Sequence, residues 1–121
     1  MGGDMADLQR IGPGKRLTDA IVHGDTVYFS GYVAESAAGG TVAEQTRDIL
    51  QQIDETLAEA GTTKERIVEA TVWLADIAFY DEMNSVWDAW VVPGGAPTRA
   101  CVEAKLASPD HAVEIRVKAV K

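Results

Sequence analysis

The sequence predicts a single α+β domain over residues 1–121, with two helices packed on one face of a mixed β-sheet of four to six strands. Three observations support this fold class. Several short runs alternate apolar and polar residues with a period of two, which is typical of half-buried strands. Two longer segments place apolar residues at helical spacing. The chain of 121 residues, 46% of them hydrophobic, is long enough for one core and too short for two.

The N-terminal part predicts a short strand followed by a hairpin. Residues 8–11 form the first run, which ends at a Gly-Pro-Gly sequence. Residues 20–23 and 26–30 are rich in β-branched and aromatic side chains and flank Gly24-Asp25, a two-residue hairpin signal. Gly31 then interrupts the second strand, which suggests a bulge or a close approach of another group to the backbone. We therefore expect a ligand near Gly31.

Two amphipathic helices are expected. Thr41 and Glu44 have the spacing of a capping box, and Gly61 is a suitable stop for a helix that ends near residue 60. A second helix, over about residues 79–91, begins after Asp76. Its apolar stripe is expected to face the sheet and contains Phe79, Met83, Val86, Trp87 and Trp90.

The C-terminal half predicts three more strands, over residues 67–74, 96–106 and 113–120. In the second of these, alternation places Arg99 and Cys101 on the face opposite Ala100, Val102, Ala104 and Leu106. In the third, Glu114 faces away from the core. Turn residues connect the last two runs, so we expect them to be neighbouring antiparallel strands on which Arg99 and Glu114 meet. A solvated pair of surface charges is the alternative interpretation.

Composition excludes several classes of function. The net charge of −8 disfavours nucleic acid as a partner, because affinity for nucleic acid comes largely from Lys and Arg. A single cysteine excludes an internal disulfide and fits a reducing compartment, and two separated histidines do not form a metal-ligand cluster. No apolar run is long enough for a membrane span, and the N-terminus lacks the pattern of a secretory signal. The cytoplasm is the expected location.

Two segments carry a resemblance to a known family. Pro97-Thr98-Arg99-Ala100-Cys101-Val102-Glu103, followed by Val113-Glu114-Ile115, resembles the C-terminal signature of the Rid (YjgF-type) family of reactive-intermediate deaminases. Gly24-Asp25-Thr26-Val27-Tyr28-Phe29-Ser30-Gly31 resembles the N-terminal strand motif of that family. The resemblance covers nearly the whole chain. It implies a chorismate mutase-like fold and a homotrimer with sites at the subunit interfaces.

The resemblance also implies a role for each site residue. Arg99 would bind the carboxylate of an enamine or imine derived from an amino acid, and the backbone N–H of Cys101 would assist it. Bidentate binding of a carboxylate is chemistry that arginine performs well. Glu114 would position the attacking water, and Ser30 would lie near the substrate's amino end. Neither a metal nor another cofactor is implied.

The chain departs from the family pattern at two positions near Gly31. Many deaminating members have a tyrosine thirteen residues before the strand-motif serine, where this chain has Leu17, which has no proton to donate. The glutamine that often follows Ser-Gly is Tyr32 here. We expect Tyr32 either to supply a phenol to the pocket from another strand or to narrow the pocket.

Together these features predict a metal-free hydrolase of the 2-iminobutanoate/2-iminopropanoate deaminase type. It would convert small enamines and imines, such as 2-aminoacrylate and 2-iminopropanoate, into 2-keto acids and ammonia. The alternative is a non-catalytic trimer that binds small carboxylates or other proteins on the same scaffold, which the loss of the tyrosine at Leu17 favours.

Overall fold

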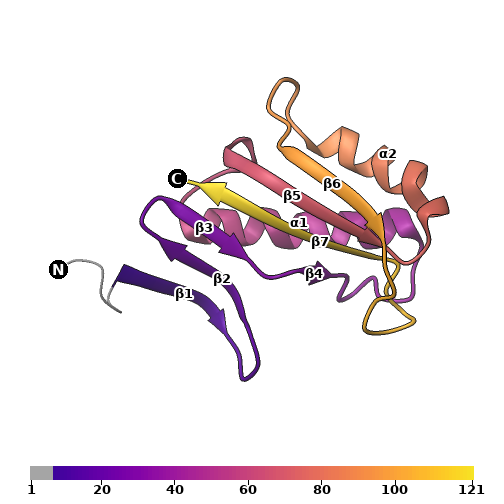
Figure 1. Ribbon diagram of the computed structural model, residues 1–121, viewed down its shortest axis with the longest axis horizontal. Coiled ribbons are helices and arrows are strands. Elements are labelled where there is room, and N and C mark those ends of the chain that lie inside the picture. Colours follow the sequence, from indigo (N-terminus) through magenta and orange to yellow (C-terminus); the bar gives the residue numbers. More distant parts are fainter. Residues whose placement is uncertain (1–6) are drawn as a thin grey trace.

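The computed structural model describes residues 7–121 and confirms the predicted α+β class (Figure 1). A seven-stranded mixed sheet has the order β1-β2-β3-β7-β5-β6, with the short β4 also paired to β7. The strands are β1 (Leu8–Pro13), β2 (Thr18–His23), β3 (Thr26–Phe29), β4 (Tyr32–Val33), β5 (Ile67–Leu74), β6 (Thr98–Glu103) and β7 (Val113–Val120). The helices are α1 (Val42–Ala60) and α2 (Tyr80–Trp90), with 3-10 turns η2 (Lys64–Arg66) and η3 (Ile77–Phe79).

The first three strands form an antiparallel meander. Gly24 adopts the left-handed conformation, with φ 61°, in the predicted turn between β2 and β3. The strand expected to continue past residue 30 instead leaves the ladder at Ser30 and Gly31 and resumes as β4. This break accounts for the extra strand in the sheet.

Helix α1 covers the middle of the sheet and supplies most of the helical part of the core (Figure 1). Ile49, Leu50, Ile53 and Leu57 are at most 2% exposed. The predicted capping box is present: Thr41 N donates to Glu44 Oε1 at 2.9 Å, and Glu44 N donates to Thr41 Oγ1 at 3.1 Å. Within residues 7–121, no helix has the length and hydropathy needed to cross a membrane.

The predicted adjacency of the last two strands is wrong. β5 lies between β6 and β7, parallel to β6 and antiparallel to β7. The physical reason is the α2 crossover, which returns the chain to the sheet in the direction of β5 and places β6 on its outer side. The turn residues between β6 and β7 reverse the chain without making the two strands neighbours.

The predicted faces of β6 are also reversed. Arg99 and Cys101 are half-buried on the helix face, whereas Val102, which is 46% exposed, lies with Ala100 on the open face. Arg99 can face the helices because its guanidinium lies 5.1 Å from the centroid of the Trp87 ring, so its stem and flat head cover apolar surface. Alternation in polarity therefore identifies the strand but assigns the wrong face to the core.

Gln45 is a buried polar residue that connects α1 to the loop before β7. Its side chain is 2% exposed. Its Nε2 donates to the carbonyls of Gly40 and Asp110 at 3.0 and 3.1 Å, and its Oε1 accepts from Ala112 N at 2.8 Å. One amide thus satisfies three backbone groups and fixes the start of β7.

We predict that Gln45→Leu lowers the free energy of unfolding by about 1–3 kcal/mol, because it leaves these backbone groups without their partner. Urea unfolding at one fixed protein concentration, followed by tryptophan fluorescence, measures the change. Gln51→Leu, on the exposed face of α1, is the matched control and should change stability by less than about 0.5 kcal/mol. Equal stabilities of the two variants would contradict the role assigned to Gln45.

Candidate functional site

The residues predicted to form one site separate into two groups in the folded chain. The first group surrounds the break between β3 and β4 and consists of Leu17, Ser30, Gly31, Tyr32 and Glu114. The second group lies on the edge strand β6 and consists of Arg99 and Cys101. Because β5 intervenes, Arg99 lies two strand spacings from β7, about 10 Å. Arg99 and Glu114 also lie on opposite faces of the sheet, so the expected meeting of the two within one chain is wrong.

Gly31 lies against the carboxylate of Glu114, which confirms the predicted close approach. A Cβ atom at Gly31 would lie 3.0 Å from Cδ of Glu114 and would collide with Oε2. The backbone around Gly31 is held by Ser30, whose N–H donates to the carbonyl of Asp19 at 3.0 Å. The Ser30 hydroxyl donates to the carbonyl of Thr18 at 2.6 Å, which leaves its oxygen free to accept. Glycine is therefore required here so that the Glu114 carboxylate can lie over the break.

Two cavities meet at Ser30 and Gly31, one on each face of the sheet. The open-face cavity has a volume of about 370 Å³ and is lined by Thr18, Ile21, Tyr28, Phe29, Ser30, Gly31, Trp73, Glu114 and Arg116. The helix-side cavity has a volume of about 330 Å³, and four carboxylates line it together with Leu17, Ser30, Gly31 and Tyr32. These carboxylates belong to Asp19, Glu35, Glu55 and Glu59. The helix-side cavity is therefore strongly acidic, whereas the open-face cavity is lined by one carboxylate, that of Glu114, and one cationic residue, Arg116.

Tyr32 lies on the helix face of the sheet, where it lines the helix-side cavity. The side chain is 7% exposed and packs against Phe29. Its hydroxyl donates to the carbonyl of Asp19 and accepts from Thr56 Oγ1, both at 3.1 Å. Burial raises the pKa of Tyr32 to about 12, so the phenol is protonated at neutral pH. Leu17 lines the same cavity and is 55% exposed.

Arg99 is held by α2, which the sequence patterns do not predict. Its Nη1 donates to Asn84 Oδ1 at 2.8 Å, and its Nη2 donates to the Tyr80 hydroxyl at 3.3 Å. The guanidinium also lies over the rings of Trp87 and Tyr80, 5.1 and 5.8 Å from their centroids. No Asp or Glu among residues 7–121 lies within ion-pair distance of it. Its Nη1 also donates weakly to Met83 Sδ at 4.0 Å, so Arg99 is oriented by neutral groups and keeps two N–H donors for a ligand.

Cys101 places its backbone amide at the free edge of the sheet. Ala104 N donates to the carbonyl of Leu74 in β5, at 2.9 Å. Since amides alternate in direction along a strand, the amides of Ala100 and Val102 point toward β5, and those of Arg99 and Cys101 point outward. Burial raises the pKa of the Cys101 thiol, an effect that the charge of Arg99 partly opposes, so the thiol is protonated at neutral pH. The geometry fits an amide donor and not a thiolate nucleophile.

The sequence patterns missed Asn84, Tyr80 and Arg116. Asn84 and Tyr80 lie beside Trp87 on α2, and the only signal for them is helical spacing from the predicted apolar stripe. Arg116 shares the open face of β7 with Glu114, two residues away, as alternation predicts, but that pattern did not identify it as a site residue. In the described part of the chain, no group of three or more His, Cys, Asp or Glu side chains is arranged to hold a metal ion.

Comparison with known proteins shows close relatives along nearly the whole chain. A family model described as Endoribonuclease L-PSP matches residues 8–121. A RutC family protein of Haemophilus influenzae is 43% identical over 108 residues, which cover 89% of this chain and 93% of that protein. The RutC family protein YoaB of Escherichia coli is 42% identical over 112 residues, which cover 93% and 96%. A crystal structure of a YjgF family member from Neisseria meningitidis superposes with a TM-score of 0.91 at 46% identity, covering 95% of each chain.

We predict a tyrosinate titration near pH 12 in the wild type that is absent from Tyr32→Phe. The pKa is raised above its ordinary value of 10.0, so the folded state holds the proton more tightly than the unfolded state. The stabilising contribution of the protonated phenol is therefore complete below about pH 10 and is lost as the pH rises through about 12. Ultraviolet absorbance of the phenolate measures the titration, with Tyr28→Phe as the control that retains it. Loss of the component in Tyr28→Phe instead would contradict the assignment.

Proposed function

The chain belongs to the Rid family, whose members bear the names RutC and YjgF, and on this premise we propose that it hydrolyses small imines of 2-oxo acids. The substrates would be of the 2-iminopropanoate and 2-iminobutanoate type, with 2-aminoacrylate as the enamine form of the first. The observation that carries the proposal is that Arg99 is held in place by neutral groups and has no acidic partner among residues 7–121. Its guanidinium is fixed by Asn84 and Tyr80, has no acid partner among residues 7–121, and lies on the same edge strand as the outward amide of Cys101. This arrangement suits a carboxylate anchor.

The chemistry requires a base for the attacking water and a route for its protons. Water adds to the C=N carbon, a proton moves to the nitrogen, and the resulting amino alcohol collapses to the ketone and ammonia. Glu114 is a suitable group to position and deprotonate this water, because its carboxylate lies over Gly31 and accepts no hydrogen bond from any residue in the range 7–121. The Ser30 oxygen lies beside the same cavity as a second acceptor.

One chain cannot bring the two halves of this site together, so we propose that two copies form each site. The edge strand β6 of one copy would supply Arg99 and the Cys101 amide, and the β3–β4 break of the next copy would supply Ser30, Gly31 and Glu114. Two different surfaces then meet at each interface, and a closed ring of three satisfies that requirement. The open face also carries apolar side chains for burial, including Tyr28 at 41% and Val102 at 46% exposed.

The second candidate is a trimer that binds 2-oxo acids without catalysis, and Leu17 is the observation that favours it. Leu17 lies at the helix-side cavity and donates no proton. The phenol of Tyr32 lines that cavity, but it points toward α1 and lies on the opposite face from Glu114. Under this hypothesis the protein binds pyruvate through Arg99 and leaves the rate of imine hydrolysis unchanged.

The description of the family model names an endoribonuclease, but we do not propose ribonuclease activity for this chain. RNA binding needs cations opposite the phosphates, and the chain carries a net charge of −8. The partners that we propose are a small carboxylate substrate and two further copies of the chain. The proposed location is the cytoplasm, where a single cysteine stays reduced.

We predict that the wild type accelerates the release of pyruvate and ammonia from 2-aminoacrylate that a dehydratase generates from serine in the same reaction. Arg99→Lys should weaken pyruvate binding roughly 10- to 100-fold, because lysine lacks the planar fork that binds both carboxylate oxygens. Arg47→Lys on the exposed face of α1 is the matched control and should leave binding unchanged. Binding without acceleration would support the second candidate. Equal pyruvate affinities of the wild type, Arg99→Lys and Arg47→Lys would show that Arg99 does not bind the carboxylate.

We predict a mass of about three times 13.0 kDa in solution, measured by light scattering. Subunit mixing provides a sharper test of the shared site. Arg99→Lys and Glu114→Gln should each abolish most of the turnover, and an unfolded and refolded 1:1 mixture of the two should recover roughly a quarter of wild-type turnover, because that fraction of interfaces combines two intact halves. An active monomer, or a mixture no better than its components, would contradict the two-copy site.

A further inference from the structure

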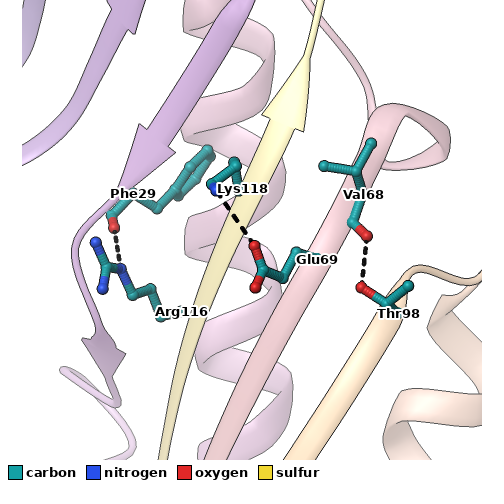
Figure 2. Close-up of polar contacts among 6 residues, drawn as sticks. All are labelled: Phe29, Val68, Glu69, Thr98, Arg116 and Lys118. Carbon is teal, nitrogen blue, oxygen red and sulfur yellow. Dashed lines mark hydrogen bonds and ion pairs between the residues drawn. The ribbon is translucent and has the colours of Figure 1, made fainter.

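The Arg116 guanidinium has terminal N–H groups that donate no hydrogen bond to residues 7–121, although the protein carries a net charge of −8. It lies on the open face of β7, and its Nε donates to the carbonyl of Phe29 at 3.0 Å (Figure 2). Figure 2 shows the side chain extending from β7 to the end of β3. The four N–H groups on its two terminal nitrogens make no hydrogen bond or ion pair with any residue from 7 to 121. The ion pair on this part of the sheet joins Lys118 to Glu69, at 3.3 Å.

Arg116 lines the open-face cavity together with the proposed water-activating group, and it also lines a neighbouring cavity of about 270 Å³ on the same face. Ser30, Gly31, Glu114 and Arg116 all line the open-face cavity of about 370 Å³, a volume that suits a small organic ligand. Glu114 and Arg116 are two residues apart on one face of the same strand, so their Cα atoms are about 7 Å apart. The bond from Nε to Phe29 fixes one edge of the guanidinium and leaves its terminal nitrogens free.

We propose that Arg116 binds a second carboxylate of the substrate, so that the site prefers 2-imino dicarboxylates, the imines of acidic amino acids. The inference rests on the proposed function, in which Arg99 of a neighbouring copy binds the first carboxylate. The reaction of the four-carbon substrate is balanced by one water: 2-iminosuccinate and water give oxaloacetate and ammonia. Such a substrate is formed when an acidic α-amino acid is oxidised at its α carbon, or when its 3-hydroxy derivative loses water.

Charge supports a dicarboxylate over a neutral side chain. A protein with a net charge of −8 repels a dianion unless a local cation compensates, and Arg116 is such a cation. The substrate end that bears hydrogen or methyl in 2-iminopropanoate and 2-iminobutanoate would place no acceptor on Arg116. A carboxylate accepts two parallel hydrogen bonds from the terminal nitrogens, which is the strongest pairing that a guanidinium makes.

The test is calorimetric titration with product-like probes that differ only in the second carboxylate. The pairs are oxaloacetate against 2-oxobutanoate and 2-oxoglutarate against 2-oxopentanoate. The expected result is that the wild type binds the dicarboxylate of at least one pair about tenfold or more tightly than its partner, and that Arg116→Gln abolishes this ratio. Arg116→Lys should retain part of the ratio. Arg47→Gln removes the same charge from the exposed face of α1 and should retain all of it.

Each other outcome overturns the inference in a recognisable way. Equal wild-type affinities within both pairs would exclude a dicarboxylate preference while leaving the proposed function intact. If Arg116→Gln leaves the ratio of dicarboxylate to monocarboxylate affinity unchanged, or lowers both affinities in a pair equally, Arg116 does not bind the second carboxylate. Failure of the wild type to bind any of the four probes would overturn both the inference and the carboxylate anchoring of the proposed function.

Discussion

The pairing of β7 with three other strands is the constraint on which the site depends. On one side β7 pairs with β5, and on the other it pairs first with β4 and then with β3. The register with β7 shifts by one residue between β3 and β4, and the chain leaves the ladder at Ser30 and Gly31 where the shift occurs. The absence of a side chain at Gly31 lets the Glu114 carboxylate occupy the space above the break. The break, the carboxylate and both cavities are thus consequences of one pairing pattern.

The edge strand β6 carries the other half of the proposed site for a reason that also lies in topology. A strand at the edge of a sheet has unpaired amides, and these would promote unspecific pairing unless they are used or covered. Helix α2 orients Arg99 beside this edge through Asn84, Tyr80 and the Trp87 ring. All three partners are uncharged, so the positive charge of Arg99 is retained for a ligand. The β5–α2–β6 crossover therefore positions both the donor edge and the side chain that complements it.

Charge distinguishes the two cavities that share Ser30 and Gly31. Four carboxylates line the helix-side cavity, which makes it a poor place for a carboxylate substrate. The open-face cavity is lined by both Glu114 and Arg116 and can accept an anion without exposing it to those acids. Tyr32 and Leu17, the two departures from the family pattern, both line the acidic cavity. The substitutions thus alter the side of the break that is remote from Glu114.

Local patterns in the sequence determined most of the fold. The capping box at Thr41, the hairpin at Gly24 and the span of β5 are set by interactions between residues close in sequence, and each was predicted correctly. Gly31 was also correctly associated with a close approach, because a glycine inside a strand often marks a place where another group lies against the backbone.

Tertiary structure decided what lies beside what. Periodicity shows that Arg99 and Ala100 occupy opposite faces, but it cannot say which face meets the helices when the apolar residues are small and a guanidinium can stack on Trp87. Nor can it say that β5 separates β6 from β7, because strand order is set by the α2 crossover and by long-range pairing. Asn84 and Arg116 carried no local signal of function for the same reason. Their roles arise only when segments far apart in the chain are packed together.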